Sequence, residues 1–242
     1  MKSAAIKLPS LSIFFPCYNE AQNIASLIAQ AQKLSPQLAS NHEIIVINDG
    51  SQDNTAAVVR DLAENDSHIR LIEHERNLGY GMSLRTGFAN ATCEWVFFTD
   101  GDGQFDMHQL EEFIPSTSSA QAIIGYRTNR AEGSLRAFNA RLFKVFIDVL
   151  FRVHVKDIDC AFKLFKTDLI KSLPLQSTGA MISAEILYRL KKKHVHVIQL
   201  PVRHLPRKYG QPSGNNLKVI FKAFYEAFRL YISMKKHSLI AR

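Results

Sequence analysis

Short apolar runs alternate with amphipathic segments along the first half of the chain. Five apolar runs read as buried strands, at 11–15, 43–47, 69–72, 95–99 and 122–124. Between the first four of these runs, three segments read as helices from their apolar spacing and flanking residues, at 20–34, 55–62 and 79–90. Strands that alternate with helices predict an α/β fold, with a Rossmann-like, mostly parallel sheet covered by helices on both faces.

The regular alternation ends after Gly125. The later pattern predicts helices at 135–151 and 184–192, a strand at 195–200 and a loop at 206–216. From 217 to 240 helical spacing returns, with apolar residues on one side and lysines or arginines elsewhere. We therefore expect one large domain over residues 1–215 and a C-terminal amphipathic helical tail over 216–242.

Polar clusters directly follow three of the predicted strands. They are Tyr18-Asn19-Glu20, Asn48-Asp49-Gly50-Ser51 and Asp100-Gly101-Asp102-Gly103-Gln104. Ligands of open α/β sheets bind beyond the carboxyl ends of the strands. The three clusters are therefore expected to form one binding site.

The third cluster has the chemistry of a site for a divalent metal. Asp100, Asp102 and Gln104 place oxygen-bearing side chains at alternate positions, and the two glycines between them let the backbone approach a ligand closely. Mg²⁺ or Mn²⁺ takes one or two protein carboxylates and completes its shell with water and substrate phosphate. A solvated acidic turn is the alternative, but the position after an apolar strand favours the metal.

Composition and charge narrow the class of partner. The chain has 242 residues, is 46% hydrophobic and carries a formal net charge of +8, with many of its lysines and arginines in the last quarter. This charge indicates an anionic partner, which is a nucleic acid, an anionic lipid or a phosphorylated substrate. The sequence contains no recognisable nucleic-acid-binding motif, so a nucleic acid is the least favoured of the three.

The sequence also bears on location. It has no apolar stretch of the roughly 18 residues that a membrane span requires, and its N-terminal segment is too short for a signal peptide. Cys17, Cys93 and Cys160 lie far apart and fit unpaired thiols in a reducing compartment. We expect a cytoplasmic protein, either soluble or peripheral on the cytoplasmic face of a membrane.

The polar clusters together carry a family resemblance. Pro16-Cys17-Tyr18-Asn19-Glu20, Asn48-Asp49-Gly50-Ser51-Gln52-Asp53-Asn54-Thr55 and Asp100-Gly101-Asp102-Gly103-Gln104 resemble the family 2 glycosyltransferases. Within that family the pattern is most similar to dolichyl-phosphate mannosyltransferases and bacterial polyprenyl-phosphate sugar transferases, and the resemblance covers roughly residues 10–215. It implies a GT-A-type fold, a nucleotide-diphosphate sugar as donor, Mg²⁺ or Mn²⁺ as cofactor and transfer with inversion.

The resemblance also implies roles for single residues on the donor side. Nucleotide base and ribose are expected to contact Pro16, Tyr18, Glu20 and Asp49. The metal on the diphosphate is expected to be held by Asp100, Asp102 and Gln104, with Asp102 taking part in catalysis. The donor itself stays open between GDP-mannose and a UDP-hexose.

The acceptor side is implied by the second half of the chain. Arg127 and Arg136 resemble arginines that hold phosphate in the lipid-phosphate relatives, and guanidinium groups suit phosphate geometry. The segment 157–163 resembles one in which a carboxylate, Asp157 or Asp159, faces the donor sugar. A basic, glycine-bearing loop resembles the one that closes over the site, and its candidate phosphate ligands are Arg203, Arg207, Lys208 and Ser213.

The acceptor decides the mechanism. A polyprenyl phosphate is already anionic and needs only to be positioned, whereas a hydroxyl of a saccharide or protein needs a general base. Asp157, Asp159 and Glu185 are the candidates for that base. The tail either lies on a membrane or packs on the domain. We favour the polyprenyl phosphate over the hydroxyl acceptor, and either over a non-catalytic nucleotide- or nucleic-acid-binding protein.

Overall fold

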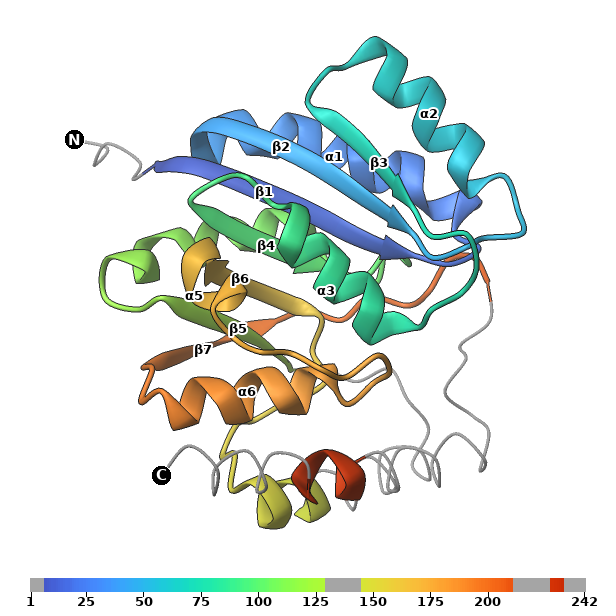
Figure 1. Cartoon of the computed structure of the whole chain (residues 1–242). Coiled ribbons are helices and arrows are strands. Elements are labelled where there is room, and N and C mark those ends of the chain that lie inside the picture. The colour runs from blue at the N-terminus through green and yellow to red at the C-terminus, as the bar shows by residue number, and fades with distance from the viewer. Residues whose placement is uncertain (1–6, 129–144, 211–226, 233–242) are drawn as a thin grey trace, which may run out of the picture.

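A computed structural model describes residues 7–128, 145–210 and 227–232 of the chain. Its centre is a seven-stranded sheet in the order β3-β2-β1-β4-β6-β5-β7. The strands are β1 (Leu8–Cys17), β2 (Ala39–Asn48), β3 (Ile69–Glu73), β4 (Trp95–Thr99), β5 (Ala122–Arg127), β6 (Phe162–Lys166) and β7 (Val197–Val202). Figure 1 shows the sheet running through the middle of the molecule, with helices before and behind it.

The sheet has a parallel part and a mixed part. β1 pairs in parallel with β2 and with β4, and β2 pairs in parallel with β3. β6 is antiparallel to both of its neighbours, β4 and β5, whereas β5 and β7 are parallel. The prediction of a mostly parallel α/β sheet is confirmed. The antiparallel strand β6 is an addition that the sequence pattern does not predict.

Helices cover both faces of the sheet, as expected. They are α1 (Ala21–Leu38), α2 (Thr55–Asn65), α3 (Tyr80–Asn90), α5 (Thr167–Lys171) and α6 (Ile182–Lys192), with short 3₁₀ helices at η1 (Met107–Glu112) and η2 (Ile114–Ser118). α1 packs with α2 and η1, while α3 packs with α5 and α6 on the other face (Figure 1). Among the described residues, no helix is both long enough and apolar enough to cross a bilayer.

Two further helical segments lie in the second half of the chain, where the sequence predicts helices. Residues 145–151 and 227–232 are helical, and they fall inside the predicted helix 135–151 and the predicted tail. The rings of Phe151 and Tyr231 lie 6.0 Å apart, so the two segments are neighbours. The proposed domain boundary at 215/216 lies outside the described residues.

The core is continuous across the sheet because both faces carry large apolar side chains. Phe14, Phe97, Phe98 and Phe165 are fully buried, and Phe14 and Phe98 stack with their centroids 5.5 Å apart. The three cysteines are buried and carry free thiols, which confirms that they are unpaired. This rigid sheet fixes the loops at its carboxyl edge, where the polar clusters lie.

Candidate active site

The loops that follow β1 and β2 interlock. The backbone N–H of Asp49 donates to the carbonyl of Cys17 at 2.8 Å, at the point where the two parallel strands end. The N–H of Asn19 donates to Ser51 Oγ at 2.9 Å, and the N–H of Gln52 donates to Asn19 Oδ1 at 2.8 Å. The structure thus brings the first two polar clusters into direct contact, as the sequence predicts.

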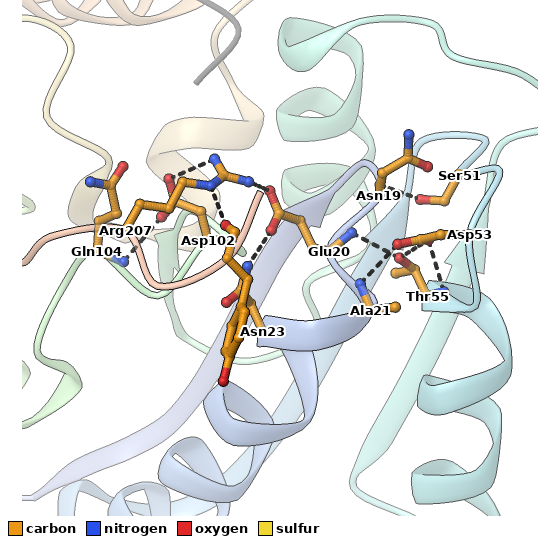
Figure 2. A network of polar contacts seen from close by, with 11 residues as sticks. Asn19, Glu20, Ala21, Asn23, Ser51, Asp53, Thr55, Asp102, Gln104 and Arg207 are labelled. Atoms are coloured by element: carbon orange, nitrogen blue, oxygen red, sulfur yellow. Dashed lines mark hydrogen bonds and ion pairs between the residues drawn. The ribbon is translucent and has the colours of Figure 1, made fainter. Parts of the chain in front are cut away.

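The same two loops fix the start of α1. The N–H of Glu20 donates to Thr55 Oγ1 at 2.9 Å, and the N–H of Ala21 donates to Asp53 Oδ2 at 3.1 Å (Figure 2). Burial raises the pKa of Asp53, but hydrogen bonds from Thr55 and Ala21 outweigh it and leave that pKa below its ordinary value. Asp53 and Thr55, to which sequence reasoning gave no role, therefore position the backbone of Glu20.

The acidic loop lies directly on the end of β1. A Cβ at Gly101 would lie 2.5 Å from Cys17 Sγ and 3.1 Å from the carbonyl oxygen of Pro16, so only glycine fits at this position. Pro16 itself is buried within β1. Pro16 therefore lies against the acidic loop, and its contact with a nucleotide stays a prediction.

The two carboxylates of the acidic loop fit a divalent cation. Asp100 Oδ1 is buried and finds no hydrogen-bond partner among the described residues. Burial, followed by the charge of Asp102, raises the pKa of Asp100 to about 7. Within the described residues no three His, Cys, Asp or Glu side chains cluster as an all-protein metal site, but Mg²⁺ and Mn²⁺ need only one or two carboxylates beside substrate oxygens. The donor set therefore suits either metal.

Gln104 is shared between the acidic loop and the segment after β7. Its backbone carbonyl accepts from the N–H of Leu205 at 2.8 Å, and its Nε2 donates to the carbonyl of Leu205 at 3.1 Å. Phe105 and His204 form an isolated antiparallel bridge beside them. These contacts fasten the segment after β7 to the acidic loop. The role of Gln104 as a metal ligand stays a prediction.

Arg207 reaches both sides of the site. Its Nη2 lies 2.5 Å from Glu20 Oε1, and its Nη1 lies 3.5 Å from Asp102 Oδ2. Figure 2 shows the guanidinium between these two carboxylates. Burial raises the pKa of Glu20, while hydrogen bonds from Asn23 and Arg207 oppose that rise. Three residues predicted separately, Glu20, Asp102 and Arg207, therefore form one cluster.

Asp49 is buried and bound to the loop that precedes α3. Its Oδ1 lies 2.6 Å from His74 Nδ1 and accepts from the N–H of Leu78 at 2.9 Å, while its Oδ2 accepts from the N–H of Gly79 at 2.9 Å. Sequence reasoning missed His74, which lies 25 positions along the chain. The carboxylate of Asp49 thus holds the start of α3, and its contact with a nucleotide stays a prediction.

Asp157 and Arg127 are bound to each other. Arg127 Nε donates to Asp157 Oδ2 at 2.7 Å and its Nη2 donates to Oδ1 at 3.0 Å, a bidentate pair between buried or nearly buried groups. The structure thus joins two residues that were predicted separately, and each group neutralises the charge of the other. The role of Asp157 as a base and that of Arg127 as a phosphate ligand stay predictions.

Glu185 is also committed to the fold. Its side chain is fully buried, and it accepts from the N–H groups of Gln176 and Ser177 and from the guanidinium of Arg189. These donors hold the carboxylate in place between α6 and the segment before it, and its role as a base stays a prediction. Of the three base candidates, Asp159 alone is exposed.

Lys163 is a buried charge that sequence reasoning missed. It lies in β6 with no solvent exposure, and its Nζ donates to the carbonyls of Ile158 and Cys160. Burial lowers the pKa of Lys163, and the nearby Cys160, Asp157, Asp159 and Asp100 oppose that shift. The signal in the sequence is a lysine inside an otherwise apolar run, which ends at Phe165. The charge of Lys163 is near enough to the acidic loop to lower the pKa of Asp100, against the larger effect of burial.

The remaining predicted residues divide into exposed and undescribed ones. Tyr18, Arg203 and Lys208 are exposed, with side chains available to a ligand. Arg136 and Ser213 lie outside the described residues, and their roles stay predictions.

A solved structure with the same fold is glucosyl-3-phosphoglycerate synthase from Mycobacterium tuberculosis, in complex with Mn²⁺, UDP and glucosyl-3-phosphoglycerate. The two chains superpose with a TM-score of 0.73, covering 92% of this chain and 80% of that one, at 17% sequence identity. At this identity the similarity shows the fold alone, and it confirms the GT-A-type architecture.

Curated relatives are similar over most of this chain. Undecaprenyl-phosphate 4-deoxy-4-formamido-L-arabinose transferase from Proteus mirabilis is 26% identical over 220 residues, which are 88% of this chain and 65% of that protein. Dolichyl-phosphate beta-glucosyltransferase from Trichomonas vaginalis is 29% identical over 206 residues, which are 77% of this chain and 61% of that protein. The chain therefore spans less than two thirds of the length of each of these relatives.

The family itself follows from a match that includes all three polar clusters. The model described as glycosyl transferase family 2 matches residues 12–190, which contain the second part of β1, all of β2 to β6, the acidic loop and most of α6. The chain belongs to glycosyl transferase family 2.

Proposed function

We propose that this chain transfers a sugar from a nucleotide-diphosphate donor to the phosphate of a polyprenyl lipid, with Mg²⁺ or Mn²⁺ as cofactor. The observation that carries the proposal is the cluster of Glu20, Asp102 and Arg207 at the carboxyl edge of the parallel strands. It combines carboxylates suited to a divalent cation with a guanidinium suited to a diphosphate.

The donor diphosphate fits the edge where the acidic loop lies. A divalent metal held by Asp100 and Asp102 would neutralise the charge that builds up on the leaving nucleoside diphosphate. Tyr18, exposed at the end of β1, offers a ring to the nucleotide base. Arg203 and Lys208, exposed beside Arg207, add positive charge for the phosphates.

Two observations favour a phosphate as the acceptor: the names of the curated relatives, and the contacts that the candidate bases already make. Two relatives are named as undecaprenyl-phosphate and dolichyl-phosphate sugar transferases. Asp157 is paired with Arg127 and Glu185 is bound by backbone donors, so two of the three candidate bases are committed elsewhere. A lipid phosphate needs no base, because its oxygen is already anionic at neutral pH.

The reaction is a single in-line displacement. An oxygen of the lipid phosphate forms a bond to the anomeric carbon of the sugar while the bond from that carbon to the diphosphate oxygen breaks. The electron pair of the broken bond leaves with the nucleoside diphosphate, and the configuration at the anomeric carbon is inverted. The task of the protein residues is to align the two anionic groups and screen their charges.

The acceptor also implies a membrane surface as a partner, at the cytoplasmic face. Two apolar pairs at helical spacing point outward on the neighbouring segments 145–151 and 227–232: Val145 with Val149, and Phe228 with Ile232. Val149 is 74% exposed and Phe228 is 53% exposed. Exposed Arg152 and Arg229 accompany them. Apolar side chains beside basic ones suit the interface of an anionic bilayer.

The test is a donor screen that follows labelled sugar into the organic phase. GDP-mannose, UDP-glucose and UDP-N-acetylglucosamine would each be offered with Mn²⁺ or Mg²⁺ and undecaprenyl or dolichyl phosphate. We expect one donor to give a metal-dependent lipid product, which falls by at least about 100-fold in Asp102→Asn. Asp61→Asn, on the exposed side of α2, removes the same charge outside the site and should retain the wild-type rate.

Two other outcomes would contradict the proposed function. Labelled product in the aqueous phase with a saccharide or protein acceptor would replace the lipid phosphate by a hydroxyl, with Asp159 as the remaining base candidate. Nucleotide binding without turnover of any donor would contradict an enzyme.

A further inference from the structure

Arg207 binds two carboxylates from distant parts of the chain. Glu20 follows β1, Asp102 follows β4, and Arg207 follows β7. The guanidinium lies 2.5 Å from Glu20 and 3.5 Å from Asp102, and its Nε donates to the carbonyl of Tyr209 at 2.6 Å. Figure 2 shows the side chains of Glu20 and Asp102 on either side of the Arg207 guanidinium. The longer distance makes Asp102 the weaker of the two ionic partners.

The charged side chains of Glu20, Asp102 and Arg207 are largely shielded from solvent. None of the side chains of Glu20, Asp102 and Arg207 is more than 19% exposed. Charges with little solvent between them are screened weakly, so a second cation on Asp102 would meet strong repulsion from the guanidinium. Arg207 and a divalent metal therefore compete for the carboxylate of Asp102.

The backbone around Arg207 lets its side chain move alone. The N–H of Leu205 is bound to the carbonyl of Gln104, which fixes the chain two residues before Arg207. On the other side stands Gly210, at a φ of +83°, where a Cβ would lie 2.7 Å from Arg207 Nη2. The glycine leaves room for the guanidinium. Arg207 can thus leave Asp102 by side-chain rotation while Leu205 stays in place.

We propose that Arg207 is a built-in counter-cation of the acidic loop, which holds Asp102 until a metal and an anionic diphosphate arrive together. This inference rests on the proposed function, because it takes Asp102 as a metal ligand. On binding, Arg207 exchanges Asp102 for an oxygen of the diphosphate and keeps Glu20 as its anchor. The result is cooperative binding, in which metal and nucleotide each favour the other and the metal alone binds weakly.

The test measures Mn²⁺ binding by the signal of free Mn²⁺ in electron paramagnetic resonance, first without nucleotide and then with UDP or GDP. Arg207→Gln removes the competing cation, so we expect it to bind Mn²⁺ alone at least about fivefold more tightly than the wild type. In the presence of the nucleoside diphosphate we expect the reverse, at least about fivefold weaker binding. Arg60→Gln, which removes an exposed guanidinium from α2, is the matched control and should leave both affinities unchanged.

The opposite signs separate competition from a merely structural role. An Arg207→Gln protein with unchanged affinity for Mn²⁺ alone, or with both affinities weakened, would overturn the inference. Should that variant fold poorly, Arg207→Lys provides the test, because an ammonium cannot bridge both carboxylates and should give shifts of the same signs and smaller size.

Asp102→Asn distinguishes the failure of this inference from the failure of the proposed function. Loss of Mn²⁺ binding in Asp102→Asn supports the metal site on which the inference depends. Mn²⁺ binding that survives this substitution, with and without nucleotide, would overturn both the metal site and the role of Arg207.

Discussion

Single buried side chains contribute to the stability of the parallel half of the sheet, and Glu43 is one of them. Its Oε1 accepts from Ser12 Oγ at 2.6 Å and from the N–H and hydroxyl of Thr92 at 2.6 and 2.8 Å. Its Oε2 accepts from Arg70 Nη1 at 2.6 Å. Burial raises the pKa of Glu43, but these donors outweigh it and hold that pKa below its ordinary value.

We expect Glu43→Gln to lower the free energy of unfolding at pH 7 by about 1–3 kcal/mol. Because the folded-state pKa is depressed, the carboxylate contributes its full stability above the unfolded-state pKa of about 4.3 and loses it as the pH falls through the folded-state value. The difference between wild type and variant should therefore shrink below about pH 4. Urea unfolding of both proteins between pH 3 and pH 8 measures this difference in the free energy of unfolding. A difference that does not change with pH would contradict this account.

The residue types of the site are more predictable from sequence than their partners. Asp100 and Asp102 stand in a short motif after an apolar strand, so local sequence is enough to identify them. The partner of Asp157 is Arg127, 30 positions away, and the partner of Glu20 is Arg207, 187 positions away. Sequence order does not specify which charged groups the fold brings together. For that reason the sequence did not predict that Asp157 and Arg127 form a pair.

At the scale of elements, α3 owes its position to a glycine. A Cβ at Gly87 would lie 2.4 Å from the ring of Phe14, so the helix packs directly on β1. The ring of Phe14 also meets Phe88 edge-on, with centroids 5.2 Å apart. α3 begins at Tyr80, beside the backbone that Asp49 holds. The packing of this helix therefore bears on the geometry of the site.

We expect Gly87→Ala to destabilise the protein by about 1–3 kcal/mol, because the added methyl group forces Phe14 out of a packed core. Helix propensity alone predicts the opposite sign, a gain of about 1 kcal/mol. Ala89→Gly, on the exposed side of the same helix, is the control and should cost about 0.5–1 kcal/mol through propensity alone. Thermal unfolding of both variants decides the matter, and a stabilised Gly87→Ala would contradict the close approach.

The predicted elements differ from the observed ones for physical reasons that can be named. β6 was not predicted because Lys163 interrupts its apolar run. In the structure this lysine is buried and donates to backbone carbonyls. α5 has five residues, too few to give a helical period. α1 continues through Pro36 to Leu38, although a proline inside a helical pattern usually marks the end of the helix. The strongly patterned β1, β2 and β4 were predicted, since both of their faces are buried.

At the scale of the whole molecule, the sheet joins a parallel half to a mixed half. The first half carries the interlocked loops after β1 and β2 and the acidic loop after β4, and the second half carries the segment with Arg207. The alternation of strands and helices predicts the first half well. The second half depends on an antiparallel strand and on long-range charge pairs, which apolar periodicity does not encode.

The exposed apolar pairs on 145–151 and 227–232 lead to a prediction about membranes. We expect the protein to bind vesicles that contain anionic lipid, with affinity that falls as salt rises. Val149→Asp and Phe228→Asp together should weaken binding by at least about tenfold, since each places a charge in the bilayer interface. Ala57→Asp, on the exposed side of α2, should not. Co-sedimentation measures all three proteins, and equal binding would exclude this surface.

The order of strands has a consequence for a chain that is still being made. β1 to β4 are neighbours in the sheet, and the later strands attach on one side of β4. During synthesis, β1 to β4 therefore leave the ribosome first. At that point β6, the strand that pairs with β4, is still to be made. Until that strand emerges, the nascent chain carries an open β edge, which is a template for pairing with other chains. Chaperone demand should therefore peak when the chain is half made.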